Sequence, residues 1–269
     1  MLTLYHYPLS PCSEKVRYAL ALKKLGWREV ILDLARKENL STDYLALNPS
    51  GCIPTLVAEE DIVTESTAIL DYIEARWPEP TLLPKLPIER AQMRLWTKWV
   101  DEILHPSWPG IAWVVLVRPR WREMGDDAVH AMIEKLPDAK RRDRQWQLYQ
   151  EGFSAEDAKK AFITFFDTMK RMNDVLSHRK WLCGDRLSLA DISIMPYFVA
   201  AQAFGVLDRE FELPLAVRNW FKELQALDFL STALRSQISP QRAQKILLTG
   251  QQALEAVRKS TLSTKTSIF

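Results

Sequence analysis

The N-terminal part of the sequence alternates between short apolar runs and amphipathic helical patterns. Apolar and other side chains alternate over residues 2–7 and stop at Pro8, which predicts a strand that ends there. Over residues 12–25 apolar positions recur at helical spacing before Gly26, which predicts a helix. The charged residues of this helix are expected off its apolar face: Glu14, Lys15, Arg17, Lys23 and Lys24.

The same reasoning predicts the remaining elements of a compact α/β domain. Strands are expected at 27–34, 55–58 and 62–64, and helices at 42–47 and 65–77. The acidic residues 59–61 make a tight reversal between the last two strands, which predicts a hairpin. The resulting order of elements is β α β α β β α.

Closely spaced prolines separate this domain from the rest of the chain. Pro78, Pro80, Pro84 and Pro87 fit neither a helix interior nor a strand interior, so they predict a stiff, extended linker. The chain is therefore divided into an N-terminal domain at 1–78, a linker at 79–88, an all-helical domain at 89–260 and a mobile polar tail at 261–269.

Helical periodicity dominates the second domain. It predicts helices at 88–104, 155–176, 188–204, 217–227 and 240–259. Ser188 and Asp191 form a capping-box pattern at the start of one of these helices. Between the first two, Pro106, Pro109 and Pro119 break the pattern and a long charged stretch follows, so no helix is assigned there.

Composition and charge exclude several classes of protein. The chain has 269 residues, of which 47% are hydrophobic, so it can bury a sizeable core in one large or two ordinary domains. Its net charge of +2 is close to neutral, whereas nucleic-acid-binding proteins are usually strongly basic, so no nucleic-acid partner is expected. The sequence has neither a signal-peptide pattern nor an uncharged apolar run of about 20 residues, so we expect a soluble protein without a membrane partner.

The cysteines and histidines predict no metal site. Cys12, Cys52 and Cys183 are an odd number at irregular spacing, which suggests neither a disulfide framework nor a zinc site. The four histidines are scattered without metal-ligand spacing. A reducing, cytoplasmic location is the expectation.

Candidate chemistry lies at the start of the first predicted helix. Ser10 before Pro11 is a good helix start, because the serine oxygen accepts a free backbone N–H and proline at the first helical position has none to leave unpaired. Cys12 then lies in the first turn, where the partial positive charge of the helix end favours a thiolate. Ser10 can turn its hydroxyl proton outward toward an incoming sulfur. The alternative is that Ser10 only caps the helix and that Cys12 is a small buried side chain without a chemical role.

Four motifs in order and spacing resemble a cytosolic glutathione transferase. They are Ser10 to Arg17, Asn48 to Leu56, Thr64 to Ile69 and Ser188 to Asp191, and they span most of the chain. Within that superfamily, residues 64–79 and 94–102 are similar to the bacterial glutathione-dependent β-aryl etherases of lignin breakdown. Related bacterial transferases of unassigned substrate share this second similarity.

The resemblance implies an α/β N-terminal domain with a thioredoxin-like fold that binds glutathione, followed by an all-α domain that supplies most of the electrophile pocket. Ser10 matches the catalytic serine of the plant and zeta-type transferases, and Cys12 matches the zeta cysteine two places further on. Ile53 would offer its backbone to the cysteinyl part of glutathione, with Pro54 in the cis form. The γ-glutamyl end would be held by Glu65 and Ser66.

The resemblance favours a transferase in which Ser10 donates a hydrogen bond to the thiolate of glutathione, which attacks a small apolar or aromatic electrophile. The resemblance implies a role in detoxification or in the breakdown of lignin-derived aromatic compounds. It also implies that the protein forms a homodimer. Ser13 is a further candidate for the thiol contact, because related bacterial enzymes are gapped differently here. Two alternatives remain: a Cys12-dependent thiol-disulfide oxidoreductase or deglutathionylating enzyme, and a non-catalytic transferase-like interaction module.

Overall fold

The computed structural model describes residues 1–134, 138–207, 213–229, 233 and 239–264. By their contacts the residues form two compact units. The first comprises Met1–Val100, Met172–Ala200 and Leu215–Gln237, and the second comprises Asp101–Arg171, Ala201–Pro214 and Ile238–Phe269. The sheet and the motifs that resemble a transferase all belong to the first unit.

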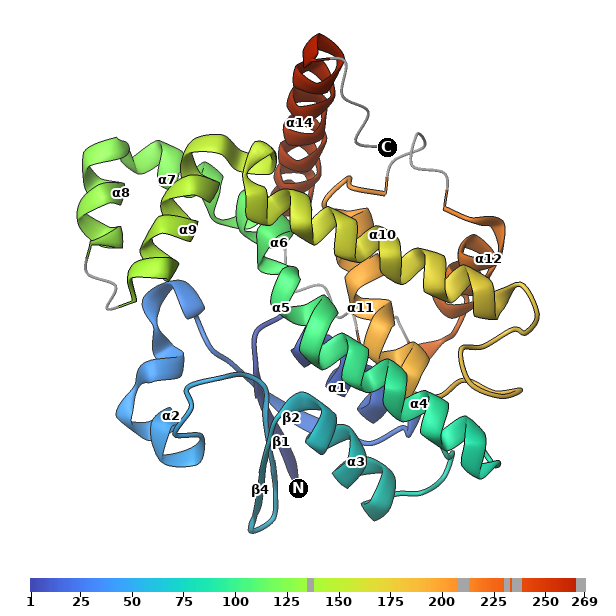
Figure 1. The fold of residues 1–269 in the computed structure, drawn as a ribbon. Helices are drawn as coiled ribbons and strands as arrows, with labels where there is room; N and C mark the ends of the chain where they lie inside the picture. The colour runs from blue at the N-terminus through green and yellow to red at the C-terminus, as the bar shows by residue number, and fades with distance from the viewer. Residues whose placement is uncertain (135–137, 208–212, 230–232, 234–238, 265–269) are drawn as a thin grey trace. The chain divides into compact units, whose positions relative to one another are not determined.

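The first unit contains a four-stranded sheet in the order β2-β1-β3-β4; Figure 1 labels strands β1, β2 and β4. Its strands are β1 (Leu2–His6), β2 (Trp27–Ile31), β3 (Thr55–Ala58) and β4 (Asp61–Thr64). Strands β1 and β2 are parallel, whereas β3 runs antiparallel to both β1 and β4. All four predicted strands are present, as is the hairpin of β3 and β4, but the second strand ends at Ile31 and not at the predicted residue 34.

Three helices complete the predicted order of this domain: α1 (Pro11–Leu22), α2 (Thr42–Leu47) and α3 (Ser66–Arg76). Helices α1 and α3 pack against each other, and each carries fully buried apolar residues, such as Leu20 of α1 and Ile73 of α3. In Figure 1, α2 lies apart from this pair, to the left of the strands. Two short 3-10 helices, η1 (Leu34–Arg36) and η2 (Glu38–Leu40), lead into α2. The thioredoxin-like fold class predicted from the sequence is confirmed.

The proline-rich segment after α3 is held in place by a buried ion pair. The ammonium of Lys23, at the end of α1, lies 2.6 Å from the Glu74 carboxylate of α3. The same ammonium donates to the carbonyls of Trp77 and Pro80, at 2.6 and 2.9 Å. The other oxygen of Glu74 accepts the Leu82 N–H at 3.0 Å. The chain from 77 to 82 is therefore fixed to both helices.

Helix α4 (Pro87–Trp99) follows, then a π-helical turn η3 (Val100–Leu104) and the short α5 (His105–Ser107). The sequence predicts one helix over 88–104, and the structure is helical there. The change from α to π geometry at Val100 was not predicted. The remaining predicted helices are also present, as α10 (Glu156–Leu176), α11 (Leu189–Ala203), α12 (Leu215–Gln225) and α14 (Pro240–Thr264). Of the predicted mobile tail, residues 261–264 belong to α14, and 265–269 lie outside the described residues.

The region without an assigned helix is helical, which corrects the sequence interpretation. It contains α6 (Pro109–Leu116), α7 (Arg118–Met124), α8 (Asp126–Ile133) and α9 (Ala139–Glu151), and then the 3-10 turn η4 (Gly152–Ser154). The prolines begin helices instead of ending structure: Pro109 is the first residue of α6 and Pro119 the second of α7. Proline is tolerated there because its missing N–H would have no intrahelical partner.

Aliphatic and aromatic residues together form the core of this helical region. Val129, Ile133 and Tyr149 are buried, and Trp113, Trp121 and Trp146 pack against them. Elsewhere in the second unit, the Trp108 ring lies 5.8 Å from that of Phe165. Most of these tryptophans therefore serve as core packing.

One half of the predicted capping box of α11 is present, the bond from the backbone of Ser188 to the side chain of Asp191. Ser188 donates to Asp191 from both its N–H and its hydroxyl, at 3.0 and 2.9 Å. The other oxygen of Asp191 accepts the indole N–H of Trp220 at 2.8 Å. The shorter aspartate thus takes the role that glutamate usually has in this motif.

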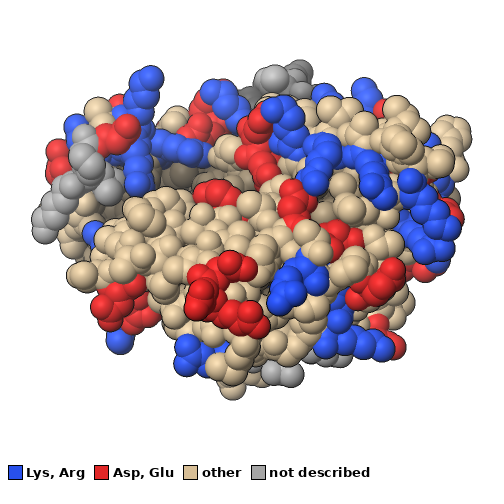
Figure 2. Space-filling model, turned by 90° about the horizontal axis from the view of Figure 1, so that it is seen from below, with Lys and Arg blue, Asp and Glu red and all other residues tan. Residues whose placement is uncertain are grey.

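Charge is mixed on the one face of the molecule that is drawn in space-filling form (Figure 2). On the face shown in Figure 2, Lys and Arg side chains are interspersed with Asp and Glu. None of the helices in the described part of the chain is both long and apolar enough to cross a bilayer.

Candidate functional site

Ser10 caps α1, as its sequence context predicted. Its backbone is extended, and its Oγ accepts the N–H of Ser13 at 3.4 Å while Pro11 occupies the first helical position. Its own N–H donates to the Tyr7 carbonyl at 3.1 Å, which closes the turn between β1 and α1. Because the hydroxyl oxygen acts as the acceptor in the cap, the hydroxyl proton is left for another partner. The side chain is partly exposed.

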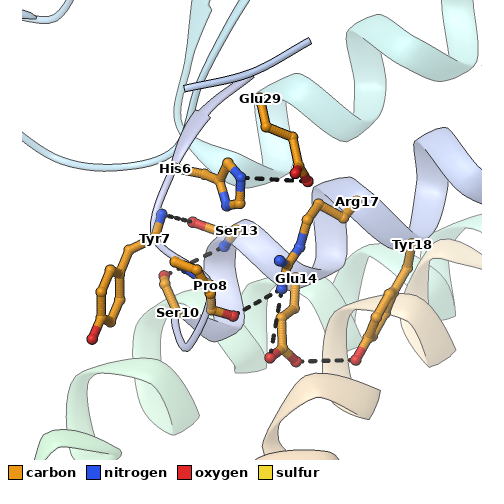
Figure 3. Close-up of polar contacts among 9 residues, drawn as sticks. All are labelled: His6, Tyr7, Pro8, Ser10, Ser13, Glu14, Arg17, Tyr18 and Glu29. Carbon is orange, nitrogen blue, oxygen red and sulfur yellow. Dashed lines mark hydrogen bonds and ion pairs between the residues drawn. The ribbon is translucent and has the colours of Figure 1, made fainter. Parts of the chain in front are cut away.

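Cys12 and Ser13 occupy different environments in the first turn of α1. Cys12 is not part of a disulfide and is partly exposed. Ser13 is fully buried, and its Oγ accepts the Tyr7 N–H at 3.4 Å, so it lies beneath the turn (Figure 3). Of the three candidates for contact with a thiol, Ser13 is the least accessible.

A group of buried polar residues lies behind this turn (Figure 3). The Arg17 guanidinium donates to the Pro8 carbonyl at 2.8 Å and lies 3.7 Å from the Glu14 carboxylate. The Tyr18 hydroxyl donates to the other oxygen of Glu14 at 3.0 Å. Burial raises the pKa of Glu14 to about 7, although Arg17 and the bond from Tyr18 oppose the shift. Burial and the same hydrogen bond also raise the pKa of Tyr18.

His6, at the end of β1, is neutral at ordinary pH. Burial lowers its pKa to about 4, and the charge of Arg17 adds to the effect. Its Nε2 lies 3.6 Å from the Glu29 carboxylate. This contact is not an ion pair above about pH 4, because the imidazole carries no charge there.

The loop before β3 carries the predicted backbone contact for glutathione. The Ile53–Pro54 peptide bond is cis, as the resemblance implied. The preceding carbonyl, that of Cys52, accepts the Tyr44 hydroxyl at 2.5 Å and the Asn48 amide at 2.8 Å. The Cys52 side chain itself is exposed. The path of the chain into Pro54 is therefore fixed by side chains of α2 and its C-cap.

The start of α3 holds Glu65 and Ser66 in an unusual geometry. Glu65 has φ 64° and ψ 115°, a positive φ that non-glycine residues adopt rarely and at a cost. Its side chain is exposed and does not cap the helix, whereas Ser66 is buried. The buried ammonium of Lys15 donates to the Thr67 hydroxyl at 2.9 Å, so a cation lies in the first turn of α3. A helix N-terminus with an added positive charge favours a carboxylate.

The sheet brings these three segments together. Tyr5 of β1 pairs with Thr55 of β3, and Thr55 pairs with Thr64 of β4. The C-terminal end of β1, the N-terminal end of β3 and the C-terminal end of β4 therefore lie along one edge of the sheet. Neighbouring strands are about 4.8 Å apart, so the turn that ends in Ser10, the cis-Pro54 loop and Glu65 lie within reach of one extended tripeptide.

In the described part of the chain, no three or more His, Cys, Asp or Glu side chains are grouped so that they could hold a metal ion. Cys183 is buried, and burial raises the pKa of its thiol to about 12, so it is inert at neutral pH.

Comparison with known proteins defines the family. Residues 4–81 match the model of the glutathione S-transferase N-terminal domain. Protein LigF of a Sphingobium species is 31% identical over 195 residues, which cover 71% of this chain and 76% of LigF. The chain belongs to the glutathione S-transferase superfamily. The crystal structure of the β-etherase LigF covers 87% of this chain and 98% of its own, with a TM-score of 0.74 and 28% identity.

Two further relatives of this glutathione S-transferase superfamily member have quite different names. The maleylacetoacetate isomerase of Pseudomonas aeruginosa is 31% identical over 76% of this chain and 82% of the isomerase. The FtsZ-localized protein A of Caulobacter vibrioides is 29% identical over 83% of this chain and 86% of its own. Likeness across the superfamily thus establishes the fold and the family, while the reaction has to be argued from the site.

Sequence reasoning missed the buried charges of α1. It placed Glu14, Lys15, Arg17 and Lys23 off the apolar face, but all four are buried. Two signals were present in the sequence: Glu14 is three residues before Arg17 and four before Tyr18, spacings at which helical side chains meet. Hydrophobic periodicity alone predicts that such charged residues are exposed to solvent, because the pattern does not show which side chains or carbonyls of other elements they contact.

Proposed function

We propose that this superfamily member binds glutathione along the edge of its sheet and stabilises the thiolate through Ser10 for attack on a small apolar or aromatic electrophile. The observation that carries the proposal is the shared edge on which the pairing of β1, β3 and β4 places Ser10, the cis-Pro54 loop and Glu65. In this proposal the backbone of Ile53 pairs with the cysteinyl part of glutathione. Glu65 and Ser66 hold the γ-glutamyl end.

The energetics of the thiolate agree with the residues present. A thiol with a pKa near 8.5 is only a few per cent ionised at pH 7, and lowering that pKa by about two units requires about 2.7 kcal/mol. A charge-assisted hydrogen bond supplies about 1.5–3 kcal/mol and a helix N-terminus about 0.3–1 kcal/mol. The Ser10 hydroxyl and the start of α1 together reach that sum, so no general base is required.

The proposed reaction is a displacement at carbon. The thiol proton leaves to solvent, and the thiolate sulfur forms a bond to the electrophilic carbon while the bond from that carbon to the leaving group breaks. The leaving group takes the bonding electron pair. Cleavage of a β-aryl ether, with a phenolate as the leaving group, is the specific case that the likeness to LigF supports.

We assign the electrophile to the helical part of the chain. A groove within the second compact unit is lined by Ile103 and Pro106 together with charged residues of α9 and α10. Arg144 and Asp157 in this lining form an ion pair at 2.5 Å. The apolar pair offers a surface for an aromatic ring, and the charged groups suit polar substituents on it.

The proposal also covers the domain limits, location and assembly. We infer a thioredoxin-like domain at 1–78 and a helical domain after the linker at 79–88. We place the protein in the cytoplasm, where cysteines usually form no disulfide, as is the case for Cys12, Cys52 and Cys183 in the structure. We infer a homodimer, and light scattering in solution checks it.

Ser10→Ala tests the thiolate site. We expect the pKa of enzyme-bound glutathione to rise by about one to two units, because a charge-assisted hydrogen bond is lost. Ultraviolet titration of the bound thiolate measures the shift, and turnover of an activated aryl halide and of a β-aryl ether measures its consequence. Ser41→Ala is the matched control, because Ser41 caps α2 by accepting the Tyr44 N–H at the same 3.4 Å.

The partly exposed Cys12 supports a second candidate function, a thiol-disulfide exchange through Cys12. In that case Cys12→Ala abolishes activity and Ser10→Ala does not, so the two variants run together decide between the reactions. An unshifted thiol in the wild-type protein would contradict the transferase proposal. Absence of all turnover despite glutathione binding would instead favour an interaction module.

A further inference from the structure

Arg17 is a buried cation that reaches back to the candidate thiolate turn from within the helix that the turn begins. It is 2% exposed, and its Nη2 donates to the carbonyl of Pro8 at 2.8 Å. Pro8 stands two residues before Ser10, inside the turn that Ser10 closes through its bond to the Tyr7 carbonyl. Figure 3 shows the guanidinium and the Pro8 carbonyl facing each other on the inner side of this turn.

The side-chain contacts at the turn differ in length, beside the backbone bond from Ser10 N–H to the Tyr7 carbonyl at 3.1 Å. Ser13 N–H to Ser10 Oγ and Tyr7 N–H to Ser13 Oγ both measure 3.4 Å, beyond the usual range of a good N–H···O bond of about 2.7–3.2 Å. The Arg17 contact is shorter and carries a charge on its donor, and such bonds are roughly twice as strong as neutral ones. It is therefore the strongest of these side-chain contacts.

Arg17 is itself held by its neighbours. Its Nη2 lies 3.7 Å from the Glu14 carboxylate, which the Tyr18 hydroxyl fixes on its other oxygen at 3.0 Å. Both of these neighbours are also buried. Burial and these neighbours restrict the Arg17 side chain, whose contact with the Pro8 carbonyl is shorter than its contact with Glu14.

We propose that Arg17 is a positioning residue for the thiolate site, which orients the Ser10 hydroxyl by fixing the Pro8 carbonyl. The inference rests on the proposed function. Arg17 contacts neither substrate directly and acts through the backbone of the turn. Its loss should lower kcat and raise the pKa of the bound thiol, and the KM for glutathione should change little because the contacts at Ile53, Glu65 and Ser66 remain.

The test compares Arg17→Met with Lys23→Met. Lys23 is also a buried cation at α1, 6% exposed, but it bonds to the carbonyls of Trp77 and Pro80 instead of the turn. We expect Arg17→Met to lower kcat by about tenfold or more, since a small misplacement of an active group has effects of that order. Arg17→Lys should restore part of the loss, because an ammonium retains one charged donor. Lys23→Met should lower thermal stability without moving the pKa of the bound thiol.

The outcomes separate this inference from the function on which it rests. An unchanged kcat and thiol pKa in a folded Arg17→Met variant overturns the positioning role, and so does an equal change in Lys23→Met. If Arg17→Met does not fold, Arg17→Lys decides the question. We then expect a small rise in the pKa of the bound thiol relative to the wild type. No rise in that pKa would count against the positioning role. If Ser10→Ala leaves the thiol pKa unchanged, the proposed function itself has failed, whatever Arg17 does.

Discussion

Helices α1 and α9 are nearly equal in length, with 12 and 13 residues, and each begins with a capping side chain. Ser10 accepts the Ser13 N–H at 3.4 Å, whereas the Asp138 carboxylate accepts the Arg141 N–H at 2.7 Å. An ionised carboxylate is the stronger cap but has no proton to donate. Ser10 gives up cap strength and keeps a donor, which is the property that an incoming thiolate requires.

The charged residues of these two helices also differ in their surroundings. In α1, Glu14, Lys15 and Arg17 are buried and engaged with other elements or with one another. In α9, Lys140, Arg141 and other charged residues are exposed. Buried charge is costly unless it is paired, so the buried charges of α1 depend on their partners in a way that the exposed charges of α9 do not.

The variant Ser10→Asp gives the helix of the candidate site the cap of α9, and it has the largest expected effect. The cap should strengthen, but a carboxylate beside the bound sulfur repels the thiolate and removes its donor. We expect turnover to fall by about a hundredfold to a thousandfold, the usual loss when one stabilising donor is removed.

Steady-state kinetics and ultraviolet titration of bound glutathione measure the effect of Ser10→Asp. Thermal unfolding should show that the variant is at least as stable as the wild type. The converse variant Asp138→Ser should leave turnover unchanged, and a comparable loss there would refute the comparison of the two caps.

The variant Glu14→Gln tests the cost of buried charge in α1. The pKa of Glu14 is raised to about 7 in the folded protein, so the folded state holds its proton more tightly than the unfolded state. The free energy of unfolding therefore falls as pH rises from about 4.5 through about 7, by about 3 kcal/mol. The neutral glutamine should remove this fall and make the variant the more stable protein at pH 8.

Urea unfolding at pH 4.5, 6 and 8 measures the pH dependence. The two proteins should be of similar stability at the lowest pH, where Glu14 is protonated in the folded wild type. Equal slopes with pH for the two proteins would show that Glu14 does not titrate in this way.

The variant Lys140→Ala has the smallest expected effect, because Lys140 is an exposed charge on α9. Removal of such a charge changes stability by less than about 0.5 kcal/mol. Chemical denaturation at neutral pH checks it. A loss of stability several times larger would mean that Lys140 makes stabilising contacts like those of the buried charged residues of α1.

Local rules predicted much of this molecule. The order β α β α β β α, the cap at Ser10 and the capping box at Ser188 depend on neighbouring residues, so spacing and residue type were sufficient. The same rules failed over 109–151, where they took Pro109 and Pro119 as breaks and exposed charge as irregular chain. A proline at a helix start and one inside a helix look alike until the surrounding helix is known.

The sequence alone determined which residue types stand at the start of α1 and the family to which the chain is similar. Only the tertiary structure decided that Ser10, Pro54 and Glu65 share one edge of the sheet, because strand pairing joins residues far apart in the chain. Only the tertiary structure, likewise, decided that Arg17 faces the Pro8 carbonyl. The physical reason is that a charged side chain is buried only where partners and packing from the whole fold offset its lost hydration, and no local pattern records these partners.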